Sequence, residues 1–139
     1  MRSKIKCLMI EPEKPPVICY MKPTKKAFRK AINQGALQRG EIEAKRVAQD
    51  VYAIFHKDRF LTNLKPNRAL EDDIISGVMF IVATDEISQP ISMTDEQVSS
   101  FTLRFWNAEV FDEMDAMEAN MSTFLSRFTH GEYLHLSQK

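Results

Sequence analysis

Residues 74–83 form an almost continuous apolar stretch with the sequence Ile-Ile-Ser-Gly-Val-Met-Phe-Ile-Val-Ala. Six of these ten residues are β-branched or aromatic, and every residue after Gly77 is apolar. Such a run is typical of a β-strand that is covered on both faces. We therefore predict that residues 74–83 form the central strand of a sheet, and that residues 65–70 form a polar loop leading into it.

Two shorter apolar segments, residues 4–10 and 16–21, flank a link that contains two prolines and two glutamates. This pattern predicts a β-hairpin. If its strands pair symmetrically about the link, Cys7 lies opposite Cys19 at a distance that allows contact between the two side chains. Two reduced thiols in the core and a disulfide bond are both open at this point.

The next segment has the pattern of an amphipathic, basic helix. Thr24 follows a proline and can cap a helix over residues 25–33, which we expect to end at Gln34 and Gly35. Apolar residues would occupy one face of this helix, and cationic residues cover much of the rest: Lys22, Lys25, Lys26, Arg29 and Lys30. This basic face is either solvated, or it contacts phosphate groups or an acidic partner.

Alternating apolar and polar residues predict two strands, over residues 41–47 and 51–56, with a turn at residues 57–59 after them. His56 ends the second of these strands. We expect it to be a surface or turn histidine and not a metal ligand.

A second helix is expected to begin at Thr94, because Thr94 and Gln97 have the spacing of a capping box. We expect its inner face to consist of Val98, Phe101, Leu103, Phe105 and Trp106.

Beyond residue 109, apolar residues recur alternately four and three positions apart, at Val110, Met114, Met117, Met121, Phe124 and Phe128. This is a heptad pattern of about two and a half repeats. The stripe can pack on the chain's own core, pair with a second copy in a homodimer through residues 107–128, or lie in a groove of a partner protein. The adaptable side chains of its methionines suit the last of these alternatives.

Together these elements predict an α+β fold, with a mixed or antiparallel sheet of about five strands and two or three helices packed on it. We expect residues 1–106 to form the core domain. Residues 107–139 are expected to form a helical, acidic, Met-rich extension that packs on the core or on a partner subunit.

The chain of 139 residues carries no net charge, but its charges are unevenly distributed. Residues 1–70 hold 16 Lys and Arg against 6 Asp and Glu, whereas residues 71–139 hold 3 against 13. Such a split indicates attraction within the fold or between subunits, or else two surfaces that face different partners. Charged residues also interrupt the first 25 residues, which lack the pattern of a signal peptide or membrane span. We expect a cytoplasmic protein that does not contact a membrane.

No stretch has the spacing of a known catalytic motif, a phosphate-binding loop or a zinc site, so we expect no catalytic residue, metal or cofactor. This argues against an enzyme without deciding the question. The polar cluster before the predicted central strand is the best candidate for a ligand site: Asn67, Arg68 and Asp72. Arg68 can bind an anionic ligand that Asn67 orients, because a guanidinium group donates parallel hydrogen bonds. The alternative is a structural salt bridge between Arg68 and the neighbouring carboxylates.

Several short motifs recur in a fixed order along the chain. They are Ile-Glu-Pro at residues 10–12, the strand start at Gly40–Glu43, Asn-Arg-Ala-Leu at 67–70, Ile-x-Gly-x-x-Phe-Ile-Val at 75–82 and Thr-Asp-Glu-Gln at 94–97. In this order and spacing they resemble a domain family of unknown function found in bacteria, phages and mobile genetic elements. The similarity spans about residues 5–106 and leaves the extension outside the family pattern.

The resemblance implies an accessory role in a phage or mobile element, and no established activity. We therefore hypothesise a noncatalytic protein that binds a host protein or a signalling molecule and inhibits a host defence system, using the extension or the Arg68 loop. One alternative is a nucleic-acid-binding accessory protein that uses the basic helix at residues 22–33. The other is a small-anion-binding protein or enzyme centred on Arg68.

Overall fold

The computed structural model describes residues 3–34, 40–57, 64–71 and 73–109. Within these ranges the chain forms eight strands and two helices, and the strands pair only in antiparallel fashion. The elements, in chain order, are β1 (Ile5–Ile10), β2 (Val17–Met21), α1 (Lys25–Ile32), β3 (Ile42–Ala48), β4 (Val51–His56), β5 (Pro66–Leu70), β6 (Asp73–Ser76), β7 (Met79–Thr84), β8 (Pro90–Ile91) and α2 (Asp95–Arg104).

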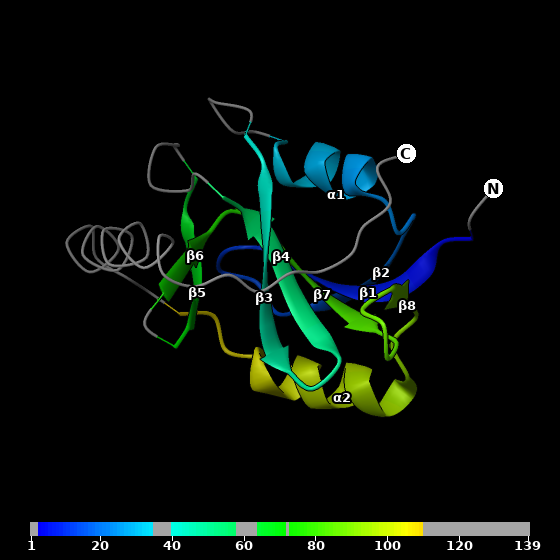
Figure 1. The fold of residues 1–139 in the computed structure, drawn as a ribbon. Coiled ribbons are helices and arrows are strands. Elements are labelled where there is room, and N and C mark those ends of the chain that lie inside the picture. Colours follow the sequence, from blue (N-terminus) through cyan, green and yellow to red (C-terminus); the bar gives the residue numbers. More distant parts are fainter. Residues whose placement is uncertain (1–2, 35–39, 58–63, 72, 110–139) are drawn as a thin grey trace.

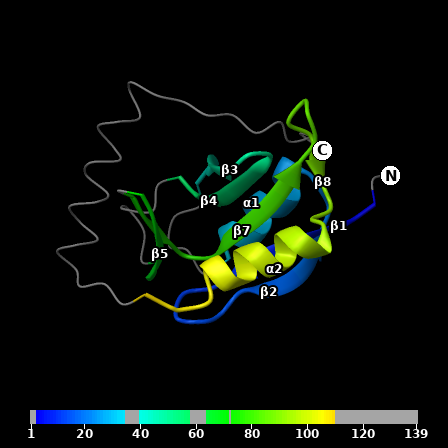
Figure 2. The same cartoon turned by 90° about the horizontal axis from the view of Figure 1, so that it is seen from below.

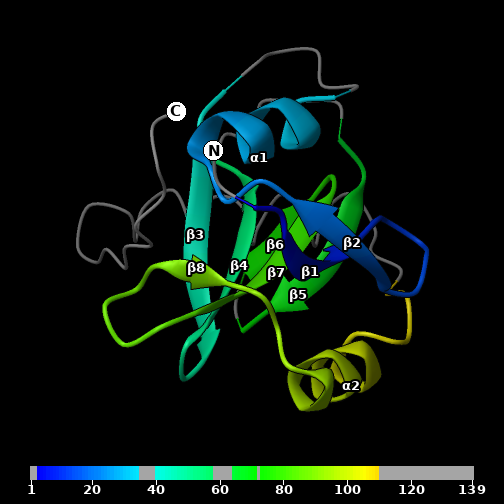
Figure 3. The same cartoon turned by 90° about the vertical axis from the view of Figure 1, so that its right-hand side faces the viewer.

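A six-stranded sheet forms the centre of the fold, with the order β2-β1-β7-β4-β3 and with β8 paired to β7. Helix α1 covers one face of this sheet and α2 covers the other (Figures 1 and 3). A separate two-stranded sheet contains β5 and β6 and lies beside the large sheet in Figure 1. The α+β class, the antiparallel sheet and the helices packed on it are confirmed, although the described residues contain more strands than predicted.

The core consists of two hydrophobic clusters, one on each face of the large sheet. Along β1, Leu8 and Ile10 belong to the cluster under α2, whereas Ile5 and Cys7 belong to the cluster under α1. This division follows from the pleat, because successive side chains of a strand point to opposite faces. The view in Figure 2 shows α2 lying across its face of the sheet.

The predicted N-terminal hairpin is confirmed. Strands β1 and β2 pair in the register that places Cys7 opposite Cys19. Both helix caps are confirmed as well. The Oγ1 atom of Thr24 accepts a hydrogen bond from the Ala27 N–H, and Thr94 forms a capping box with Gln97. These features depend on residues close together in the sequence, which explains why the pattern alone located them.

The predicted single strand over residues 74–83 is wrong, because the chain changes sheets at Gly77. Gly77 has a φ of 80°, which a glycine adopts at little cost, and its N–H donates to the Lys65 carbonyl at 2.8 Å. The first part, β6, pairs with β5, and only the second part, β7, is central, between β1 and β4. The stretch predicted as a loop is largely strand β5.

Two predictions of exposure are also wrong. Leu103 and Trp106, predicted to be buried, are 79% and 54% exposed, whereas Phe101 and Phe105 are buried as expected. Phe101 and Phe105 are four residues apart and share the inner face of α2, whereas Leu103 lies on the opposite side of the helix. His56, predicted at the surface, is fully buried, as are all six residues of β4, an inner strand of the large sheet.

Candidate functional site

Asn67 and Arg68, the central residues of the predicted ligand site, lie inside the protein. They belong to β5, and the side chain of each is almost inaccessible to solvent, with exposures of 0% and 1%. Asp72, the third residue of that prediction, lies outside the described residues.

Each N–H group of the Arg68 guanidinium has an acceptor within the protein. Nε and Nη2 donate to the Phe105 carbonyl at 3.2 and 2.9 Å, and Nη2 also donates to the Lys14 carbonyl at 2.6 Å. Nη1 donates to the carbonyl and to Oδ1 of Asn67, at 3.3 and 2.9 Å. Since a guanidinium has five N–H groups, these five hydrogen bonds leave none for an external anion.

Three of the five hydrogen bonds of Arg68 reach segments that are distant in sequence, and the other two reach the adjacent Asn67. They join the end of α2, the link between β1 and β2, and strand β5 itself. These acceptors are uncharged oxygen atoms, and the neighbouring carboxylate of Glu71 pairs with Lys45 at 3.6 Å. Burial lowers the pKa of Arg68, and the negative charge of Glu109 opposes this shift.

The Asn67 side chain links two further segments of the chain. Its Nδ2 donates to the carbonyl of Ile10 at 2.7 Å and to that of Gly77 at 2.8 Å. One amide therefore ties the end of β1 to the bend that separates β6 from β7. The described contacts of Asn67 and Arg68 are those of a structural junction between the two sheets.

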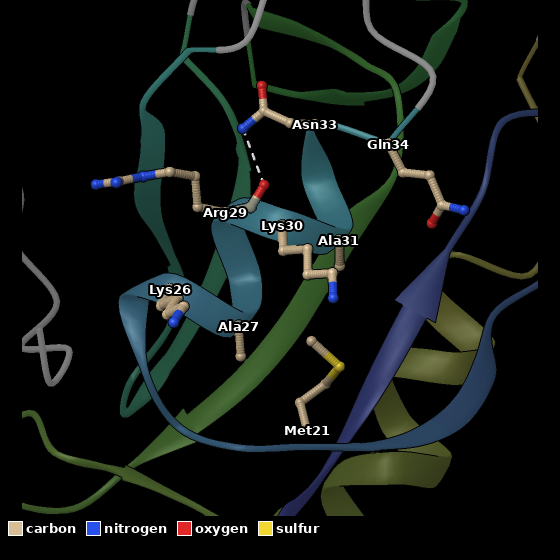
Figure 4. Close-up of a pocket in the computed structure, with 8 residues that line it drawn as sticks. All are labelled: Met21, Lys26, Ala27, Arg29, Lys30, Ala31, Asn33 and Gln34. Atoms are coloured by element: carbon tan, nitrogen blue, oxygen red, sulfur yellow. Dashed lines mark hydrogen bonds between the residues drawn. The ribbon is translucent and has the colours of Figure 1, made fainter. Parts of the chain in front are cut away.

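A groove of about 780 Å³ lies beside α1, within the size range of ligand-binding pockets. It is lined by Met21, Lys26, Ala27, Arg29, Lys30, Ala31, Asn33 and Gln34. Figure 4 shows the side chains of Lys30 and Met21 extending toward one another, with Ala27 and Ala31 on the same side of the helix. Short apolar side chains and a methionine thus border the groove together with lysines.

The charges around α1 divide into a paired and an unpaired set. Lys25 and Arg29 both contact Oε2 of Glu41, at 3.2 and 2.9 Å. The hydrogen bond from Lys25 and the two positive charges lower the pKa of Glu41. Lys26 and Lys30, by contrast, are exposed and form no ion pair with a carboxylate of the described residues. They make the border of the groove positive.

Of the predicted basic face, the groove therefore contains Lys26, Arg29 and Lys30, whereas Lys25 points to Glu41 and Lys22 is exposed before the helix begins. The apolar part of the groove was not predicted from the sequence. The spacing of Ala27 and Ala31, four residues apart beside Lys26 and Lys30, is the signal that was available for it.

Asn33 fixes the end of α1 at one end of the groove. Its Nδ2 donates to the carbonyls of Arg29 and Gly40, each at 2.9 Å, and its Oδ1 accepts from the Gly40 N–H at 2.8 Å. These hydrogen bonds hold the end of α1 to Gly40, which precedes β3.

Strand β2 is a second exposed surface. It lies at the edge of the six-stranded sheet, and no other described strand pairs with its outer side. The strand contains no charged residue, and Val17, Ile18 and Tyr20 are each about half exposed. Uncovered apolar edge strands tend to pair with other chains.

One further predicted feature lies outside the described part of the chain. The apolar stripe of the extension (residues 110–128) lies outside it, and the predicted boundary at residue 106 therefore stays a prediction. The described residues contain no cluster of three or more His, Cys, Asp or Glu side chains able to hold a metal ion. None of the described helices is long and apolar enough to cross a membrane.

Comparison with known proteins identifies one family. The model of the domain of unknown function DUF3846 matches residues 5–105. No curated protein and no solved structure matches the chain. The matched residues include every described helix and strand.

Proposed function

Because the chain belongs to the DUF3846 family of domains of unknown function, whose description assigns no activity, we propose a function from the groove beside α1. The protein is a noncatalytic binding protein, and this groove binds an acidic, amphipathic segment of a partner protein. The observation that carries the proposal is the combination of unpaired lysines and apolar side chains along one side of α1.

The chemistry of the groove defines the segment that fits it. Lys26 and Lys30 lie one helical turn apart on the exposed side of α1, where they can pair with carboxylates of a partner. Met21, Ala27 and Ala31 offer apolar surface between the helix and the end of β2, and a methionine side chain adapts to different partners. Amphipathic segments commonly bind by placing their apolar face in such a groove.

The same residues favour a protein segment over a nucleic acid. Single-stranded nucleic acids stack their bases on aromatic side chains, and none of the residues that line the groove is aromatic. Glu41 also pairs with two of the cations that the nucleic-acid hypothesis requires, Lys25 and Arg29, and offsets one of their two positive charges. The hypothesis of an anion site at Arg68 receives less support, because its N–H groups already donate within the protein.

The family resemblance extends this proposal to a biological setting. We propose that the protein is a cytoplasmic accessory protein of a phage or mobile element, that its partner is a host protein, and that binding inhibits a host defence system. The groove supports only the binding step of this proposal, and the setting depends on the resemblance.

Charge reversal in the groove tests the binding step. We propose to compare the wild type with the double variant Lys26→Glu/Lys30→Glu, using fluorescence anisotropy with a labelled amphipathic peptide of Glu and Leu. Two reversed charges near the surface should weaken binding of this peptide about tenfold or more. The control is Lys14→Glu/Lys65→Glu, which makes the same change in net charge at two exposed lysines that do not line the groove, one before β2 and one before β5.

The control double variant should bind the peptide as the wild type does. If both double variants lose affinity equally, net charge and not the groove governs binding, and the proposal is wrong. A parallel titration with a labelled DNA oligonucleotide separates the alternatives. Binding of DNA but not of the peptide, with a steep dependence on salt, would replace the proposal by the nucleic-acid hypothesis.

A further inference from the structure

Two cysteines face each other across the N-terminal hairpin. Cys7 of β1 lies directly opposite Cys19 of β2, and their Sγ atoms are 3.2 Å apart. Both cysteines are free thiols in the structure. They lie on the face of the sheet that α1 covers, in or against the hydrophobic cluster that includes Phe28.

The two thiols differ in their access to solvent. Cys7 is fully buried, because β1 lies between β2 and β7. Cys19 is only partly buried, and its strand is an edge strand with no described strand on its outer side. A reagent in solution can therefore reach Cys19 more readily than Cys7.

The backbone geometry brings the pair within reach of a bond. The Lys6 N–H donates to Ser92 Oγ at 3.0 Å, and the Lys6 carbonyl accepts from the Met93 N–H at 2.9 Å, so the backbone of Lys6 faces away from β2. Because successive residues alternate, the backbone of Cys7 faces β2 and forms a hydrogen-bonded pair with Cys19. The Cα atoms of such a pair are about 5.5 Å apart, within the range that a disulfide spans.

We propose that Cys7 and Cys19 form a reactive dithiol site that exchanges with low-molecular-weight disulfides such as oxidised glutathione, with Cys19 as the entry thiol. This proposal does not depend on the proposed binding function. The proposal rests on the position and the exposure of the two thiols, and their pKa shifts agree with it. The hydrogen bond from Cys7 lowers the pKa of Cys19, whereas that bond, together with burial, raises the pKa of Cys7.

The exchange proceeds in two steps. The Cys19 thiolate attacks one sulfur of the small disulfide, whose S–S bond breaks, and one glutathione leaves as a thiolate that takes up a proton. Cys7 then loses its proton and attacks the Cys19 sulfur, which breaks the mixed disulfide and releases the second glutathione. In sum, two protons and two electrons pass from the protein to the small disulfide, and the protein gains one internal disulfide.

The product would lock β1 to β2 beside the groove. Cys19 and Met21 are two residues apart on β2 and both pack against the cluster under α1, and Met21 also lines the groove. A glutathione attached to Cys19 would therefore lie next to the groove until Cys7 displaces it.

The experiment is a time course of the full chain with oxidised glutathione, quenched by alkylation and analysed by intact mass and peptide mapping. The wild type should lose the mass of two hydrogen atoms and contain a Cys7–Cys19 bridge that a reducing agent removes. Cys7→Ala should instead accumulate a stable glutathione adduct on Cys19, because no second thiol resolves it. Cys19→Ala should remain unmodified for as long as the protein stays folded.

Two results would overturn the proposal. One is complete alkylation of both cysteines in the wild type after prolonged exposure to oxidised glutathione. The other is modification of Cys19→Ala as fast as that of Cys7→Ala, which would show that Cys19 is not the entry thiol. The serine variants at both positions provide a second pair, and circular dichroism of all four variants establishes that the folded protein is the species that reacts.

Discussion

Replacing Arg68 by methionine tests whether this arginine is the structural junction between the two sheets. Methionine replaces the unbranched stem of arginine but has no guanidinium group and no hydrogen-bond donor, so Arg68→Met leaves the Phe105 and Lys14 carbonyls and both oxygens of Asn67 without this partner. A hydrogen bond to a charged group contributes about 1.5–3 kcal/mol, and an unsatisfied buried acceptor costs about 1–3 kcal/mol. The variant no longer buries a charge, which offsets part of this loss.

The net loss should be about 3–5 kcal/mol in the free energy of unfolding, because the Phe105, Lys14 and Asn67 acceptors each lose a partner at about 1–3 kcal/mol and the lost burial of a charge offsets part of this sum. Since single domains are stable by only about 5–15 kcal/mol, a loss of this size is readily measured. The assay is urea unfolding, followed by circular dichroism and by the fluorescence of Trp106. This is the chain's single tryptophan, and it directly follows the residue whose carbonyl binds Arg68.

Two further variants make the measurement specific. Arg68→Lys keeps the charge but supplies fewer donors from a single nitrogen, so its stability should lie between the wild type and Arg68→Met. Lys30→Met removes an exposed cation with no described ion pair, and its stability should stay within about 0.5 kcal/mol of the wild type. A loss of less than about 1 kcal/mol in Arg68→Met would refute the reasoning, because the hydrogen bonds would then contribute no more than ordinary neutral ones.

Three other changes test separate parts of the structure. Gly77→Ala should lower stability by about 1–2 kcal/mol, because φ is 80° and a Cβ would meet Leu64 Cδ1 at 2.9 Å; an unchanged melting temperature would contradict this. Thr94→Ala removes one side of a capping box and should cost about 1 kcal/mol in urea unfolding, whereas Thr94→Ser should recover most of it. Glu41→Gln tests the lowered pKa of Glu41, whose stabilising effect is present above the usual carboxyl pKa and is lost as the pH falls through the folded value. As the pH is lowered, the free energy of unfolding should fall less in Glu41→Gln than in the wild type. The difference should be less than about 1 kcal/mol, because the carboxylate is exposed. An equal fall in both proteins would contradict the lowered pKa of Glu41.

The elements that the sequence predicted correctly are those determined by neighbouring residues. Thr24 and Thr94 cap helices through groups three residues away, and the pairing of Cys7 with Cys19 follows from a short link between two apolar segments. The strand over residues 51–56 was predicted with its observed limits, because its apolar run is bounded by polar residues on both sides.

The errors arose where a residue's environment is set by distant segments. Helical spacing places Leu103 on the side of α2 opposite Phe101, so only one of the two can be buried, and the packing of α2 on the sheet determines that it is Phe101. His56 is buried because strands from two other parts of the chain flank β4. Within the candidate groove, the lysines were evident from the sequence, but the contribution of Met21 depends on how β2 and α1 pack together.

In residues 65–83, the features determined by the sequence alone can be distinguished most clearly from those determined by the tertiary structure. The sequence by itself determined that a buried strand and a distinctive polar segment occur there, because apolar periodicity and turn residues act locally. Only the tertiary structure decided that the chain changes sheets at Gly77, and that Arg68 donates to carbonyls of residues 14 and 105 and not to the neighbouring acids. The physical reason is that a buried guanidinium binds the acceptors that folding brings around it, and apart from those of Asn67 their positions are not determined by the residues beside Arg68.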